Sequence, residues 1–122
     1  MLEITIPTEP KAFVWLQPRT SEDGTPANPI TWEVTVRPAD EVMRSTMLNE
    51  RRGSYYMALA LECVDAITRA EYNGGPVKVN GKMATDPAMR DMVLRNFVGF
   101  SSACGREAAR LGELVEVERG NS

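Results

Sequence analysis

The chain has no histidine and only two cysteines among its 122 residues. Histidine is the commonest general base and the commonest metal ligand, so its absence argues against the usual hydrolytic and metal-dependent sites. Cys63 and Cys104 lie too far apart in the sequence for a zinc finger. Each falls on the apolar side of an expected helix, where a reduced cysteine behaves as a small hydrophobic residue. We therefore expect two buried thiols, no metal, no cofactor and no enzymatic activity.

Long apolar runs are also missing, and the first ten residues lack the basic and apolar regions of a secretory signal. The formal net charge of −3 provides no overall attraction to nucleic acid or to an anionic membrane. The arginines between positions 37 and 52 are interleaved with acidic residues, which is typical of a mixed, solvated surface. We expect a cytoplasmic protein that binds neither membrane nor nucleic acid.

The composition, with 43% hydrophobic and 25% charged residues, is that of an ordinary globular protein. A chain of this length can bury a core without disulfides or metal. The sequence predicts a single domain over residues 1–122, of the α+β class and mainly helical. We expect about four helices, an N-terminal antiparallel β-hairpin and a second short hairpin around Asn80-Gly81.

The stretch Ser54 to Tyr72 is the predicted core helix. Its apolar residues recur three and four positions apart and cover more than one stripe of a helix. Ser54 can cap the first turn, and Asn73-Gly74-Gly75-Pro76 must end the helix. Neighbouring elements should therefore contact this helix on several sides.

Two segments rich in β-branched and aromatic residues precede this helix. Ala12–Gln17 and Ile30–Arg37 predict the two strands of the antiparallel hairpin. Between them, residues 18–29 are rich in Pro, Gly, Asn, Asp and Ser, which predicts a long mobile loop.

The two ends of the chain are predicted to be peripheral. Leu2–Ile6 alternates apolar and polar residues, but the prolines after it limit residues 1–11 to an edge strand or an extended arm. Such an arm often reaches a neighbouring subunit. Residues 116–122 are charged or polar and should form a frayed tail.

Further helix and turn signals complete the pattern. Pro38-Ala39-Asp40-Glu41 predicts a helix start, and Gly53 separates that helix from the core helix. Thr85-Asp86-Pro87 predicts another start, and the last helix should begin at Ser101 or Ser102. The segment around Asn80-Gly81 superficially resembles a phosphate loop. However, its second glycine falls one residue late, and turn chemistry favours a type I′ hairpin.

Methionine is the one excess in the composition, with seven residues. Methionine fills irregular cores, and it also adapts to changing apolar contacts on partner-binding surfaces. The apolar and aromatic residues of the predicted helices can therefore be read either as core residues or as contacts with a partner. The candidate partner contacts are Met43, Met47, Tyr55, Tyr56, Phe97 and Phe100.

The order of elements resembles the tail assembly chaperones of long-tailed bacteriophages. The residues that carry this resemblance are a short strand pair including PITWEVTVRPADEVM, a central helix LALECVDAI, a hairpin with NGGPVKVNGK, and helices ending RNFVGFSSACGREAARLGEL. The likeness spans most of the chain, from about Ala12 to Leu114.

The resemblance implies a protein that holds the tape measure protein and recruits tail tube subunits in the host bacterial cytoplasm, and that forms homo-oligomers. A structural virion component, such as a head-tail connector or a tail completion protein, is the alternative. A small enzyme or regulator is the third class, and it would require a deep pocket with convergent polar groups.

Overall fold

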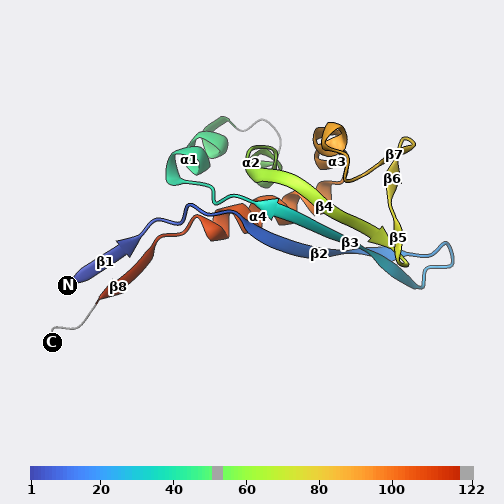
Figure 1. Cartoon of the computed structure of the whole chain (residues 1–122), viewed down its shortest axis with the longest axis horizontal. Coiled ribbons are helices and arrows are strands. Elements are labelled where there is room, and N and C mark those ends of the chain that lie inside the picture. The colour runs from blue at the N-terminus through green and yellow to red at the C-terminus, as the bar shows by residue number, and fades with distance from the viewer. Residues whose placement is uncertain (51–53, 119–122) are drawn as a thin grey trace.

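The computed structural model describes residues 1–50 and 54–118, which form an α+β fold (Figure 1). Helices account for 36% of the chain and strands for 39%, so the expectation of a mainly helical domain was wrong. The strands are β1 Leu2–Thr5, β2 Lys11–Thr20, β3 Pro26–Val36, β4 Val64–Tyr72, β5 Gly75–Pro76, β6 Lys78–Val79, β7 Lys82–Met83 and β8 Val115–Glu118. The helices are α1 Glu41–Glu50, α2 Tyr55–Cys63, the short 3-10 helix η1 Pro87–Met89, α3 Arg90–Asn96 and α4 Val98–Leu111.

The predicted N-terminal hairpin is confirmed as β2 and β3, which open a four-stranded sheet of order β2-β3-β4-β5. Trp15 lies directly opposite Trp32, and both point to the face that packs against the helices, here called the inner face. Trp32 is fully buried and stacks on Phe100 of α4, with ring centroids 4.2 Å apart. Its indole N–H donates to Gln17 Oε1 at 2.9 Å, so the buried polar group keeps a partner.

The hairpin is longer than the sequence predicts. The mobile loop expected over residues 18–29 is reduced to residues 21–25, because β2 continues to Thr20 and β3 starts at Pro26. Pro18 is tolerated in β2 because the pairing register shifts between Gln17 and Arg19. At such a bulge the backbone N–H that proline lacks is not needed for strand pairing. The Asp23 carboxylate accepts from the N–H and the hydroxyl of Thr25, which holds the turn and lowers the pKa of Asp23.

The predicted core helix over residues 54–72 was wrong in its second half. Helix α2 ends at Cys63, and Val64–Tyr72 is strand β4, paired with β3. Two register shifts leave Asp65 and Thr68 as extra residues of β4, each beside a normal pair. These bulges bury every third residue, Val64, Ile67 and Ala70, and that spacing imitates a helix.

No loop separates α2 from β4, and two arginines hold this junction. Arg37 donates its backbone N–H to the Cys63 carbonyl at 2.8 Å and its guanidinium to the Glu62 carbonyl at 2.7 Å. Arg90, half-buried, donates Nε to the Val64 carbonyl at 2.6 Å and Nη2 to the Leu61 carbonyl. The last carbonyls of a helix have no partner inside it, so these contacts satisfy them where the chain turns into the sheet.

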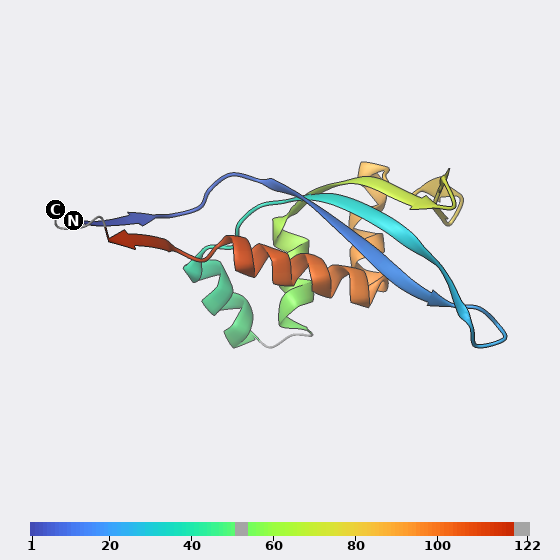
Figure 2. The ribbon, with the colours of Figure 1, turned by 90° about the horizontal axis from the view of Figure 1, so that it is seen from below.

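Helix α4 crosses α2 closely (Figure 2). A Cβ added at Gly105 would lie 1.7 Å from the Tyr56 carbonyl oxygen, and one added at Gly112 would lie 1.8 Å from that of Ala39. The Ala39 N–H donates to the Ala108 carbonyl of α4 at 3.0 Å. Small residues on this side of α4 therefore let two other backbone segments come into direct contact with it.

Most of the remaining signals are confirmed, but the predicted Ser54 cap was wrong: Ser54 precedes α2 without a side-chain capping hydrogen bond. Asn80 and Gly81 both have positive φ in the turn between β6 and β7, as a type I′ turn requires. Asp40 accepts the N–H of Met43 at 2.7 Å, just before α1 begins, and Asp86 accepts that of Ala88 before η1. Helix α4 starts at Val98, earlier than predicted. The predicted break at Gly53 lies outside the described residues.

The two ends of the chain form one element. Strand β1 pairs antiparallel with β8, and Figures 1 and 2 show this two-stranded ribbon extending away from the body. The expected edge strand is therefore present at the N-terminal end. The expected frayed tail was wrong for residues 116–118, which belong to β8, and residues 119–122 lie outside the described part.

Replacing Gly105 with alanine should destabilise the protein by about 3 kcal/mol or more, because the new methyl group meets backbone atoms that cannot rotate away. Chemical denaturation measures the change. Gly99→Ala is the matched control in the same helix, since its Cβ would meet only the end of the Trp15 side chain at 3.4 Å. That variant should be neutral or stabilising by up to about 1 kcal/mol. Equal effects of the two substitutions would contradict the close crossing.

Replacing Arg90 with methionine should cost about 2–4 kcal/mol in the free energy of unfolding, because two carbonyls at the α2–β4 junction lose charge-assisted hydrogen bonds. Arg95→Met, an exposed position of α3, is the control and should change stability by less than about 0.5 kcal/mol. An Arg90 variant as stable as the Arg95 variant would show that water replaces the guanidinium at no cost.

Candidate protein-interaction site

The β1–β8 ribbon is exposed along its whole length. Every residue of both strands is exposed, including four large apolar side chains with exposed fractions between 45% and 57%. These residues are Leu2, Ile4, Val115 and Val117. A two-stranded ribbon is at best marginally stable alone in water, and exposed apolar side chains of this kind mark interaction surfaces.

The register places these residues on two faces of the ribbon. Leu2 lies opposite Glu118 and Ile4 opposite Glu116, so one face carries the apolar side chains of β1 and the acidic ones of β8. The other face carries Val115 and Val117 beside Thr5 and Glu3. The charged side chains of the two strands are all glutamates.

Strand β2 is an edge strand, paired only with β3 in the described sheet. Its central part, Ala12–Gln17, carries no charge, and Val14 and Leu16 are 48% and 54% exposed on the face away from the helices. The charged residues of β2 are Lys11 and Arg19, both basic. Proteins usually protect such edges with charge or proline, so an uncharged, apolar edge is suited to pairing with another strand.

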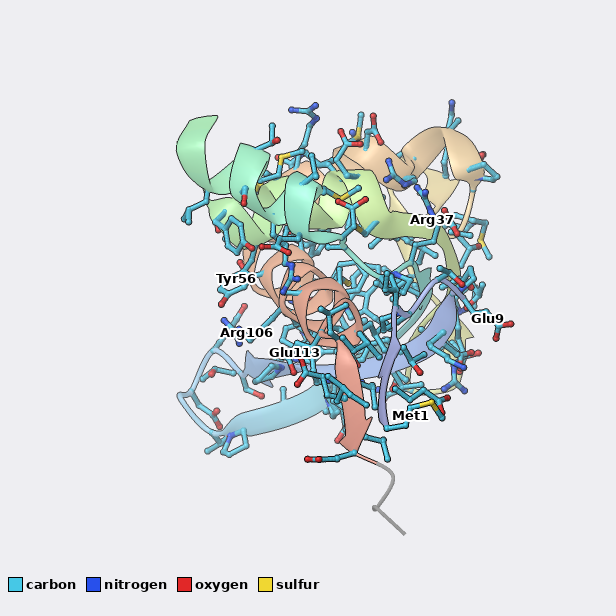
Figure 3. All side chains as sticks on the ribbon, turned by 90° about the vertical axis from the view of Figure 1, so that its left-hand side faces the viewer. Met1, Glu9, Arg37, Tyr56, Arg106 and Glu113 are labelled. Atoms are coloured by element: carbon cyan, nitrogen blue, oxygen red, sulfur yellow. The ribbon has the colours of Figure 1, made fainter. Side chains whose placement is uncertain are left out.

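An open groove of about 460 Å³ runs beside this edge, between β2, α2 and α4. Phe13, Trp15 and Tyr56 line it with apolar surface, while Arg106 and Arg110 line it from α4. The Arg106 guanidinium lies 5.1 Å from the centre of the Tyr56 ring, and Arg110 pairs with Glu107. Figure 3 shows Tyr56, Arg106 and Glu113 on one side of the molecule, above the β2–β3 hairpin.

The candidate contacts named from the sequence do not form one surface. Met43 and Met47 are half-buried on α1 and pack on the core, and the Cys63 thiol donates to Met43 Sδ at 3.3 Å. Tyr55 and Tyr56 are half-buried at the start of α2, with ring centroids 5.1 Å apart. Of these four residues, Tyr56 lines the groove.

The other two candidates belong to the aromatic cluster beneath the sheet. Phe100 is only 1% exposed, and Phe97 is half-buried with its ring edge against Trp32. A partner could contact Phe100 only if the core opened. The N-terminal arm was expected to reach a neighbouring subunit, but its residues were not named among the contact candidates. Strand β8 was missed, although Val115–Glu118 alternates apolar and acidic residues.

The two cysteines are buried and unpaired, as predicted. Burial raises the pKa of the Cys63 thiol to about 11 and that of the Cys104 thiol to about 12. Because the thiolate is the reactive form, both residues are poor nucleophiles at neutral pH.

Two kinds of site are absent from the described residues. Residues 1–50 and 54–118 hold no group of three or more His, Cys, Asp or Glu that could bind a metal ion. Within the same ranges, no helix has the length and apolar character needed to cross a membrane.

Comparison of the chain with protein-family models, curated proteins and solved structures gave no match in any of the three cases.

The thiols should react slowly with a disulfide reagent in the native state at pH 8, and at full rate once denaturant unfolds the chain. Absorbance of the released thiolate measures the rate, and a short tripeptide with a free cysteine provides the reference. Native thiols that react within tenfold of this reference would contradict the burial of both residues.

Proposed function

We propose that this chain is a non-enzymatic assembly factor that binds other proteins through exposed β-strands. The observation that carries the proposal is the β1–β8 ribbon, whose apolar side chains are exposed on both faces. Burying such side chains against a partner gains about 25 cal/mol per Å² of apolar surface, which a ribbon without a partner does not gain. Backbone N–H and C=O groups at the free strand edges add directional contacts.

The resemblance to phage tail assembly chaperones suggests the partners. In this proposal the chain works in the host bacterial cytoplasm and binds the tape measure protein, the tail tube subunits, or both. Exposed apolar strands suit this role because they can shield apolar segments of a long partner until the tail assembles. The half-buried side chains on α1 and α2, such as Met43 and Tyr55, remain predicted contacts.

A structural virion component is the second candidate, and the shape of the sheet favours it. The β2–β3 hairpin and the ribbon extend in opposite directions from the body (Figure 1). Strands that reach outward in this way can pair with neighbouring subunits in a permanent ring, such as a connector or a tail completion ring. The two candidates differ in whether the protein stays in the mature particle.

Co-expression with a tape measure protein and a tail tube protein encoded near this gene tests the proposal. A chaperone should keep the tape measure protein soluble in a stoichiometric complex, measured by size-exclusion chromatography with light scattering, and should be missing from purified particles by mass spectrometry. Presence in the particles at a fixed copy number would favour the structural component. A chain that binds neither protein and is missing from the particles would disprove both proposals.

A further inference from the structure

The exposed ribbon and the exposed edge of β2 have complementary charges. All charged residues of β1 and β8 are acidic, namely Glu3, Glu116 and Glu118, whereas those of β2 are basic. The groove beside β2 is lined by two arginines, Arg106 and Arg110, and by two glutamates, of which Glu107 pairs with Arg110. Like charges would oppose the pairing of two ribbons or of two β2 edges, whereas a ribbon beside a β2 edge brings opposite charges together.

We infer that the ribbon of one copy pairs with the β2 edge of a second copy, with β8 as the strand added to the sheet. The ribbon of the same copy extends away from its own sheet (Figure 1), which leaves the β2 edge free for a neighbour. The contact joins two different surfaces of the chain. It therefore leads head-to-tail to a closed ring or to a longer assembly.

The alternation of β8 matches the two faces of the β2 edge. Side chains of adjacent strands line up on the same face, so Val115 and Val117 can lie beside Val14 and Leu16 on the face away from the helices. This contact removes two pairs of exposed apolar side chains from water.

The same arrangement directs the acidic residues of β8 to the other face. Glu116 and Glu118 then point into the groove, where Arg110 already pairs with Glu107 and the Arg106 guanidinium lies over the Tyr56 ring. Arg106 is therefore the arginine that these carboxylates would pair with. Arginine and carboxylate form strong, directional pairs when partly shielded from water. Both faces of the added strand therefore meet chemically suitable neighbours.

Two double variants test this inference on the chain alone, without any other protein. The ribbon variant Ile4→Lys/Val117→Lys places each lysine opposite a glutamate, Glu116 and Glu3, so the ribbon keeps favourable pairs while its apolar contacts are lost. The edge variant Val14→Lys/Leu16→Lys places lysines on exposed positions of β2, with position 14 opposite Glu33. Circular dichroism verifies that both variants are folded.

Light scattering should show that the wild-type chain self-associates and that each variant alone is a monomer. Mixing the two variants should restore binding, because the edge variant keeps an intact ribbon and the ribbon variant keeps an intact edge. The mixture should stop at a 1:1 dimer, since no other intact pair of surfaces remains. Ala66→Lys, an exposed position on β4 away from the edge, should self-associate like the wild type.

Three results would overturn the inference. A wild-type chain that stays monomeric at high micromolar concentration would do so, and it would leave partner binding as a separate question. A mixture that fails to form the dimer would point to contacts between like surfaces. Loss of self-association in the Ala66 variant would show that added charge alone explains the effect. Success here with failure to bind tail proteins would disprove only the proposed function.

Discussion

The direct junction between α2 and β4 determines how the two halves of the molecule fit together. A helix that runs into a strand without a loop leaves its last carbonyls exposed or unpaired. Here Arg37 reaches the junction from the end of β3, and Arg90 reaches it from the start of α3. The two arginines thus tie the sheet and the C-terminal helices to the same turn of backbone, and the positions of both depend on it.

A second constraint acts along α4, where backbone segments touch without side chains between them. Gly105 admits α2, and Gly112 admits the segment at Ala39 that leads into α1. This close approach is possible only with glycine, because a Cβ would overlap carbonyl oxygens. It brings α4 close enough to the sheet for Phe100 to stack on Trp32. Gly112 directly follows the last residue of α4, so its contact with Ala39 lies close to the start of β8 at Val115.

Local signals in the sequence were sufficient for the elements whose causes are local. The hairpin of Ala12–Gln17 with Ile30–Arg37, the Asn80-Gly81 turn and the cap at Asp86 all follow from neighbouring residues. The strand β4 could not be recognised, because its two bulges give it the three-residue spacing of a helix. The pairing of Leu2 with Glu118 could not be predicted either, because no local pattern in one strand specifies which distant strand it pairs with. For the same reason the named contact candidates lay on helices, and only the N-terminal arm was expected to reach a neighbouring subunit.

Substitutions at core residues and at exposed apolar residues have different meanings in a binding experiment. Phe100 illustrates a candidate whose substitution would unfold the protein and would mimic a loss of binding. Val14 and Val117 are instead apolar where water reaches them, and the core gains little from them. Valine favours the strand conformation, but threonine does so too, so strand propensity alone does not require an apolar residue at these positions. The strand pairing proposed above gives these side chains a role, since a strand from a second copy would bury them.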